Sequence, residues 1–196
     1  MKLGPARIGL LACFATILSI IACSGQADRS LDDAMAVAEQ GNQALQDLDW
    51  EAYAALLHPD ELDRFKGSVM PDLERLAPQD SAGMITLFDR KFNIDSLRAS
   101  TSGKFFVDIL QTVFRISPEL KRSFTKMQNE NIGAVPQADT LAHVVVHTTM
   151  QLGMQFVDEM NVTSMRKYEG AWKLRLSAKI EGIAYMLQQS LQAQKP

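Results

Sequence analysis

Residues 142–151 read AHVVVHTTMQ, and this stretch decides the fold because its side chains alternate with a period of two. Ala142 and Val144 fall on one face of an extended strand, and His143 and His147 fall on the other. A helix would instead repeat its apolar side chains every three or four residues. The stretch therefore predicts a β-strand that lies with one face against a core and the other face half-exposed.

Further strands are predicted on both sides of this one. Gly153 permits a turn, and a return strand is expected over residues 156–167. A second turn at residues 169–170 leads into an alternating strand at residues 172–176, and a weaker strand is expected at residues 132–136. The sequence therefore predicts an antiparallel meander of three to four strands.

Three consecutive helices are predicted before the meander, each with a side chain suited to cap its first turn. Their expected ranges are residues 30–48, 49–57 and 60–76, capped by Ser30, Asp49 and Asp60. His58 and Pro59 should end the second helix, and Pro71 should kink or break the third. Further helices are expected at residues 84–92, 105–114, 117–127 and 180–191, with loops at residues 78–83 and 98–103.

Helices first and strands afterwards define an α+β domain. We expect N-terminal helices packed on a curved antiparallel sheet, with a closing C-terminal helix. This order resembles the nuclear-transport-factor-like, cystatin-like fold, and the resemblance is carried by the helix over residues 49–59 and by GAWKL at residues 170–174. It implies a cone with a cavity between the helices and the sheet. Large aromatic side chains of the helices, such as Trp50 and Phe105, would fill the core or line that cavity.

The start of the chain has the three parts of a secretory signal. Lys2 and Arg7 precede a charge-free apolar run over residues 8–21, and Ala22 supplies a small residue at its end. As a helix the run rises about 21 Å, which is less than the roughly 30 Å hydrocarbon core of a bilayer. A permanent transmembrane anchor is therefore disfavoured, and ordinary cleavage followed by soluble secretion is a second alternative.

The run ends in Ile20-Ile21-Ala22-Cys23, which resembles the lipobox of bacterial lipoproteins. The resemblance implies cleavage before Cys23 and a diacylglycerol thioether on its sulfur, and Ser24 implies sorting to an outer membrane that faces the periplasm. We therefore expect a lipid-anchored protein of the cell envelope. Its expected parts are a signal peptide at residues 1–22, the lipidated cysteine with a short tether at residues 23–30, and a single α+β domain at residues 31–196.

Composition excludes several classes of function. The chain has 20 Lys and Arg residues against 23 Asp and Glu residues, and its formal net charge of −3 falls to about −5 once Lys2 and Arg7 leave with the signal. An acidic domain without a run of basic residues is not expected to bind nucleic acid. Its two cysteines are Cys13, within the signal, and Cys23. The mature domain therefore has no thiol for nucleophilic catalysis, zinc binding or a disulfide.

His143, His147, Asp158 and Glu159 are the candidate polar residues of a cavity or a sheet face. The two histidines lie about 13 Å apart along one strand, too far to share a metal ion, so no metal site is expected. Asp158 and Glu159 point to opposite faces of the return strand, so at most one of them could form a general acid–base pair with a histidine. No nucleophile elbow or phosphate-binding loop occurs, so no catalytic residue or cofactor is expected.

Binding without catalysis is therefore the expected function, with an envelope protein or a small apolar molecule as the partner. The second hypothesis is a periplasmic carrier of a lipid or another hydrophobic ligand. Residues 172–174 and 180–183 resemble the end of the phospholipid carriers of the toluene-tolerance family, although Leu176 and Ser177 stand where those carriers usually have an aspartate. The third hypothesis is a small isomerase-like or hydrolase-like enzyme.

Replacing Cys23 by Ser is expected to release the protein from membranes, because the sulfur that would carry the lipid is lost. Membrane fractionation and intact-mass measurement of the purified chain check this expectation. Cys13→Ser is the matched control and should leave attachment unchanged. An unmodified Cys23 sulfur in the wild-type chain, or a retained signal, would contradict lipidation.

Overall fold

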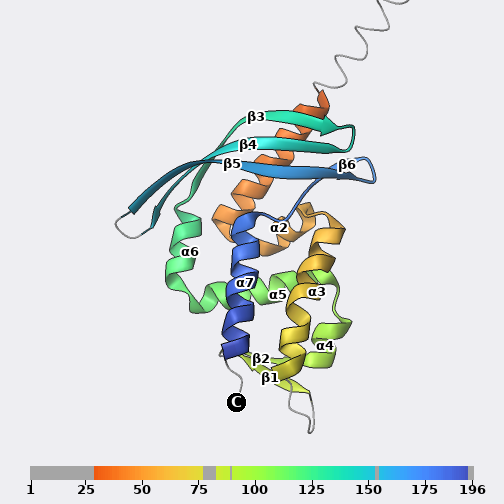
Figure 1. The fold of residues 1–196 in the computed structure, drawn as a ribbon, viewed down its shortest axis with the longest axis vertical. Helices are drawn as coiled ribbons and strands as arrows, with labels where there is room; N and C mark the ends of the chain where they lie inside the picture. The colour runs from red at the N-terminus through yellow and green to blue at the C-terminus, as the bar shows by residue number, and fades with distance from the viewer. Residues whose placement is uncertain (1–28, 77–82, 89, 153–154, 194–196) are drawn as a thin grey trace, which may run out of the picture.

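The computed structural model describes residues 29–76, 83–88, 90–152 and 155–193. It confirms the predicted α+β class, with an antiparallel sheet that arches over one side of a layer of helices (Figure 1). The proposed signal with Cys23, the turn at Gly153 and most of the predicted loop at residues 78–83 lie outside the described residues.

The main sheet is the predicted meander, with strand order β3-β4-β5-β6 and antiparallel pairing throughout. Its strands are β3 (Gln128–Ala138), β4 (Leu141–Leu152), β5 (Gln155–Tyr168) and β6 (Ala171–Leu174). β3 is longer than predicted, and two register irregularities in its pairing with β4 accompany the extra length. β6 is shorter than predicted, because the chain leaves the sheet after Leu174 and enters the closing helix. β5 pairs with β6 only over residues 165–168, so the earlier part of β5 has no β6 residue paired with it.

Six of the predicted helices are present on one side of this sheet. They are the N-terminal helix (residues 29–47), α2 (Trp50–Leu56), α3 (Pro59–Leu76), α5 (Ser102–Ile116), α6 (Pro118–Thr125) and α7 (Ala178–Ala193). A further helix, α4 (Ile94–Ala99), was not predicted. Asp49 caps α2 as predicted, and its Oδ1 accepts a hydrogen bond of 2.9 Å from the backbone N–H of Ala52. The predicted loop at residues 98–103 is shorter in the structure, since α4 continues to Ala99 and Thr101 already caps α5.

The start and the interior of α3 differ from the prediction. Its first residue is Pro59, and His58 rather than Asp60 occupies the capping position, where its Nδ1 accepts a hydrogen bond from the Asp60 N–H. Proline suits the first position of a helix because its missing N–H is not needed there. The helix also continues through Pro71, since Val69 and Leu73 on either side are fully buried and hold both turns in the core.

Residues 84–93 form a hairpin, so the helix predicted over residues 84–92 is wrong. β1 (Met84–Leu87) pairs antiparallel with β2 (Arg90–Asn93), and the two strands lie at the end of the helical layer opposite the main sheet (Figure 1). Burial alternates along β1, with Ile85 and Leu87 inward. A short apolar run fits a helical and an extended pattern equally well, and packing on the helices selects the extended one.

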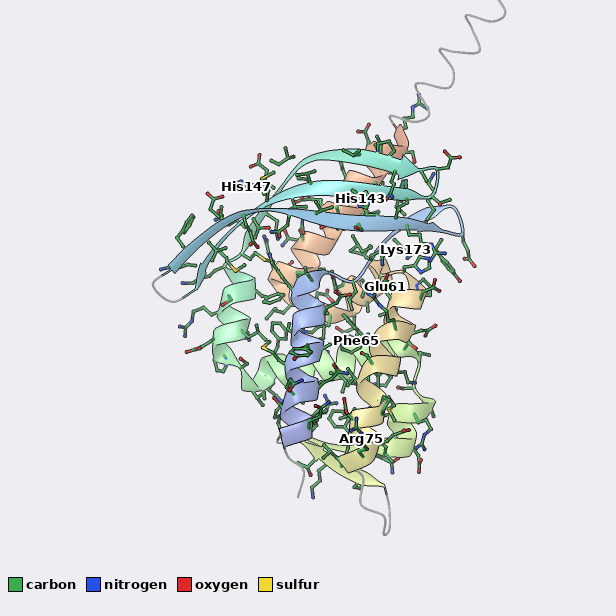
Figure 2. All side chains as sticks on the ribbon, in the orientation of Figure 1. Glu61, Phe65, Arg75, His143, His147 and Lys173 are labelled. Atoms are coloured by element: carbon green, nitrogen blue, oxygen red, sulfur yellow. The ribbon has the colours of Figure 1, made fainter. Side chains whose placement is uncertain are left out.

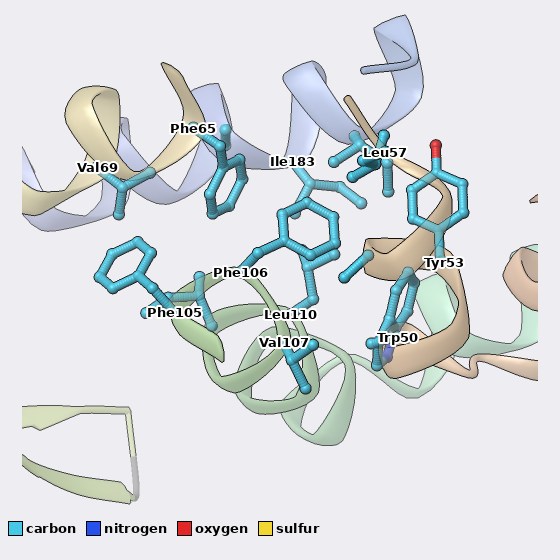
Figure 3. Close-up of a cluster of buried hydrophobic side chains, with 14 of the residues drawn as sticks. Trp50, Tyr53, Leu57, Phe65, Val69, Phe105, Phe106, Val107, Leu110 and Ile183 are labelled. Atoms are coloured by element: carbon cyan, nitrogen blue, oxygen red, sulfur yellow. The ribbon is translucent and has the colours of Figure 1, made fainter. Parts of the chain in front are cut away.

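The core contains the aromatic side chains of the helices. The Phe65 ring of α3 packs edge-on against the Phe106 ring of α5 at a centroid distance of 4.9 Å, between α3, α5 and α7 (Figure 3). Trp50 of α2 packs against Phe114 of α5 at 4.5 Å. Both α5 and α7 thus bury one apolar face, and the core joins the helices to the sheet.

The N-terminal helix packs very closely on the sheet. A Cβ added at Gly41 would lie 2.5 Å from Cδ1 of Leu174, which is itself buried at the end of β6. At the start of the same helix, the Trp172 indole N–H donates a hydrogen bond of 2.7 Å to the Ser30 carbonyl oxygen. These contacts fix the helix against the sheet at the end where β6 lies.

Gly41→Ala is expected to lower the free energy of unfolding, because overpacking a buried contact costs about 1–3 kcal/mol and exceeds the gain in helix propensity. Gly67→Ala is the matched control: this helical glycine has open space around it, and the same change should stabilise the protein by about 0.5–1 kcal/mol. Urea denaturation of both variants measures the difference. Equal stabilisation by the two substitutions would contradict the close contact.

Candidate functional site

The face of the sheet that covers the helices, here called the inner face, changes character along its length. Near β6 it is apolar, and Ala142, Val144, Met165 and Leu174 are all buried there. The other half of the inner face carries amide and hydroxyl side chains from Asn129, Asn131, Thr148, Asn161 and Thr163. A face used only for packing would be apolar throughout, because a buried polar group costs free energy unless it is hydrogen-bonded.

Most of these polar side chains have partners. Thr148 donates through Oγ1 to Asn129 Oδ1 at 2.7 Å, and Asn131 donates through Nδ2 to the Met35 carbonyl oxygen at 3.1 Å. Asn161 donates to Glu159 Oε1 at 2.9 Å. Asn129 Nδ2 is the exception: it is buried and has no hydrogen-bond partner among the described residues. An unpaired buried donor in a polar region indicates a place for a water or a ligand group.

A cavity of about 310 Å³ lies between the N-terminal helix, the inner face and the segment that joins β6 to α7. Its apolar walls come from Ala38, Leu45, Val146, Leu174 and Leu176. Its polar walls include Asn129, Thr148, Asn161, Thr163 and Ser177. The cavity borders the part of β5 that β6 does not cover. Its volume is at the lower end of the roughly 300–1,000 Å³ of small-molecule sites.

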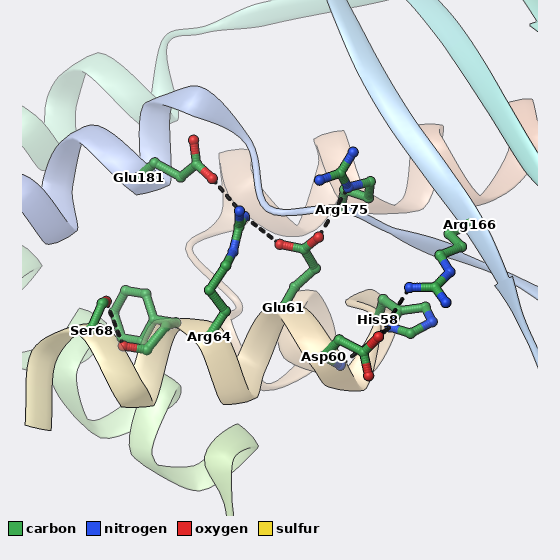
Figure 4. Close-up of polar contacts among 9 residues, drawn as sticks. His58, Asp60, Glu61, Arg64, Ser68, Arg166, Arg175 and Glu181 are labelled. Atoms are coloured by element: carbon green, nitrogen blue, oxygen red, sulfur yellow. Dashed lines mark hydrogen bonds and ion pairs between the residues drawn. The ribbon is translucent and has the colours of Figure 1, made fainter.

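A network of charged side chains holds one wall of this cavity. Glu61 of α3 is almost completely buried and accepts hydrogen bonds from Arg64 Nη2 at 2.5 Å and from Arg175 Nε at 3.0 Å (Figure 4). Arg64 also donates to Glu181 Oε1 of α7 at 2.6 Å. A buried carboxylate is tolerated only when it is paired. The network therefore holds α3, α7 and the segment between β6 and α7 in one arrangement.

Lys179, in the first turn of α7, is the least well paired cation of the cavity. Its Nζ lies 3.7 Å from Glu159 Oε1 and 3.3 Å from the Met127 sulfur. Burial lowers the pKa of Lys179 below its ordinary value, and the charge of Glu159 offsets part of this effect. Glu159 therefore compensates the ammonium group incompletely.

Tyr53 of α2 contributes a buried hydroxyl to the cavity wall. Burial raises the pKa of Tyr53 to about 12, and hydrogen bonds with Ser177 counteract only part of the rise. The phenol therefore stays protonated at physiological pH and acts as a neutral hydrogen-bonding group.

The predicted site residues separate between the two faces of the sheet. His143 and His147 lie on the outer face, away from the helices (Figure 2). His147 Nε2 lies 2.7 Å from Asp158 Oδ1, and His143 contacts Ser164 and Gln137. The predicted pairing of a histidine with an acid thus occurs, but it occurs outside the cavity.

Glu159 lies on the other face of β5 from Asp158, as the alternation of the strand predicts. Its partners are Asn161 and Lys179 at the cavity, and neither histidine is among them. Of the predicted candidates, Glu159 is therefore the one that belongs to the cavity region.

The outer face also exposes a group of apolar side chains. Ile132, Val135, Phe156, Met160 and Val162 are each between 54% and 71% exposed. Exposed apolar side chains on one face are typical of a protein–protein contact when they form a continuous patch.

Sequence reasoning missed the polar residues of the cavity, chiefly Asn129, Asn161 and Lys179. A signal for Asn161 was present, because Asn161 and Thr163 alternate in step with Met165, which is buried. Polar residues at inward positions of a strand point to a polar pocket rather than a core. Lys179 had no such signal, since its position depends on how α7 packs.

Comparisons with known proteins gave a likeness among solved structures. A scan against protein-family models found no match, and a search of curated proteins found no relative. Among solved structures, the chain is similar to an NTF-2-like protein of unknown function from Shewanella oneidensis MR-1, with 13% sequence identity and a TM-score of 0.38. The match covers 73% of this chain and 92% of that protein. The likeness is low by both measures, and no function follows from it.

Within the described residues, no helix combines the length and the apolar character needed to cross a membrane. In the same part of the chain, no group of three or more His, Cys, Asp or Glu side chains is arranged to hold a metal ion.

The raised pKa of Tyr53 predicts a loss of stability at alkaline pH. The unfolded chain ionises this tyrosine near pH 10, whereas the folded chain keeps it protonated until about pH 12. Its contribution is therefore fully present below pH 10 and is lost between about pH 10 and 12, by roughly 3 kcal/mol at most.

Urea denaturation at pH 8 and pH 11 of the wild type and of Tyr53→Phe measures this contribution as the difference in pH dependence. Tyr185→Phe, at an exposed tyrosine of α7, is the control and should behave as the wild type does. An identical loss of stability in wild type and Tyr53→Phe would contradict the assignment.

Proposed function

We propose that this chain is a lipid-anchored, non-catalytic binding domain of the cell envelope that holds a small ligand in the cavity beneath its sheet. The observation that carries the proposal is the polar half of the inner face, where Asn129, Thr148 and Asn161 line the cavity. Amide side chains at these inward positions contribute little net stability, since hydrogen bonds within the protein replace those with water. A ligand that accepts hydrogen bonds would account for them.

The geometry supports binding better than acid–base catalysis. A general acid or base must reach its substrate, within hydrogen-bonding distance or through one water. His147 and Asp158 form the clearest pair of this kind, but they lie on the outer face, and the Asp158 side chain is 60% exposed. Glu159, at the cavity, already pairs with Lys179 and Asn161.

The proposed envelope location rests on the sequence Ile20-Ile21-Ala22-Cys23. Between Cys23 and the start of the N-terminal helix at Arg29, the chain can span at most about 20 Å. Trp172 holds Ser30 against the sheet, so a lipid on Cys23 would keep this end of the sheet close to the membrane. Sorting to the outer membrane, facing the periplasm, is part of the same proposal.

Two other functions have support from particular features. The exposed apolar side chains of the outer face favour a protein partner of the envelope as the second candidate. A carrier of hydrophobic ligands would use the cavity itself, but its mixed lining suits a ligand with one polar end better than a wholly apolar one.

Native mass spectrometry of the full chain, purified gently from membranes, tests the ligand proposal. The wild type is expected to carry a bound small molecule. Thr163→Phe should lose it, because Thr163 lines the cavity and the larger side chain would fill it. Met160→Phe is the matched control on the same strand, where an exposed outer-face residue changes. No bound molecule in wild type and control, or an equal amount in Thr163→Phe, would overturn the proposal.

A further inference from the structure

The charged residues that line the cavity are Arg64, Arg175, Lys179 and Glu181. Arg64 and Arg175 both donate hydrogen bonds to Glu61, and Arg64 also donates to Glu181, so close carboxylates compensate both guanidinium groups. A ligand group that brings negative charge would need a cation without such a close carboxylate.

Lys179 is the cation with capacity for such a group. An ammonium group has three donors, and good N–H···O hydrogen bonds span about 2.7–3.2 Å. The nearest carboxylate oxygen, from Glu159, lies 3.7 Å away, and the other contact is the weakly accepting Met127 sulfur. Glu159 is meanwhile hydrogen-bonded to Asn161. A ligand oxygen could therefore bind Lys179 without displacing a close hydrogen bond.

The start of α7 adds to the same positive field. Ser177, Ala178 and Lys179 all line the cavity, and they begin a helix of 16 residues. The N–H groups of a first helical turn carry a partial positive charge. One of them, the Ile180 N–H, donates to Ser177 Oγ at 3.4 Å. The side chain of Lys179 and the first turn of α7 thus act on one region of the cavity.

The cavity lining also includes apolar side chains. Ala38 and Leu45 of the N-terminal helix face the space, together with Val146 and Leu174 of the sheet. A ligand that fits both parts has an anionic head and a short apolar tail. The modest volume of about 310 Å³ excludes a two-chain lipid from lying wholly inside.

We propose that the cavity binds a small amphiphilic carboxylate, with its carboxylate on Lys179 and its tail between the N-terminal helix and the sheet. This inference rests on the proposed ligand-binding function and specifies its ligand class. A carboxylate carries one negative charge and two acceptor oxygens, which match the charge and the donors of one ammonium group. Incomplete compensation of Lys179 in the free protein agrees with this assignment.

Calorimetric titration of the full chain in detergent, with the heat of titration into micelles subtracted, tests the ligand class. The probes are octanoate, 1-octanol, octylammonium and acetate. Octanoate is expected to bind at least about tenfold more tightly than octanol, octylammonium or acetate, because only octanoate has both the charge and the tail.

Variants of Lys179 identify the partner of the carboxylate. Lys179→Gln should reduce octanoate affinity about tenfold and leave octanol affinity unchanged, whereas Lys179→Arg should keep most of the preference for octanoate. The melting temperature of each variant shows whether it is folded, and the nitrogen chemical shift of Lys179 Nζ should change on addition of octanoate to the wild type.

Different results separate the two proposals. Equal binding of octanoate and octanol, an octanoate preference that survives in Lys179→Gln, or no binding of octanoate would overturn the carboxylate proposal. If octanol binds and Thr163→Phe blocks it, the cavity still functions as a ligand site and only the ligand class is wrong. If Thr163→Phe leaves the binding of every probe unchanged, the proposed function fails as well.

Discussion

The contact between the N-terminal helix and the sheet at Gly41 constrains the rest of the structure. Because Gly41 has no side chain, the helix approaches Leu174 closely, and a Cβ at residue 41 would require the Leu174 side chain to move. β6 ends at Leu174, and the chain turns away into α7. Gly41 and Leu174 also line the cavity between the helix and the inner face of the sheet. The close approach of the helix and the early end of β6 thus both shape this cavity.

Polar groups are buried here where folding alone would favour apolar ones. Glu61 joins Arg64 and Arg175 beside the cavity, and Thr148 joins Asn129 on the inner face. Such groups contribute little net stability, since hydrogen bonds within the protein replace those with water. They do restrict the geometry, because each requires its partner at one distance and angle. Polar groups held in one geometry beside apolar side chains are suited to selective binding of a ligand with a polar end.

The helices and the meander were predictable because each is long enough to show its period. The strand at residues 142–151 and its return strand pair antiparallel as the predicted meander requires, and the helix predicted over residues 105–114 is α5, which buries an apolar face. Residues 84–93 were not predictable in the same way, because a few apolar side chains fit either period. For Pro71, burial of the flanking turns outweighs the local preference against helix. Local signals failed where they were short or where packing opposed them.

The candidate site, like the fold, was predictable from the sequence only in part. Alternation along β5 by itself determined that Asp158 and Glu159 point to opposite faces, and composition alone determined that the domain beyond Cys23 has no thiol. Only the tertiary structure decided that Glu159 lies on the inner face, where it contacts the cavity residue Lys179, while Asp158 and the histidines face outward. The physical reason is that a period of two defines two faces, whereas the helices that cover one of them decide which face is inside. Lys179 reaches the cavity for a related reason, since the early end of β6 places the first turn of α7 beside β5.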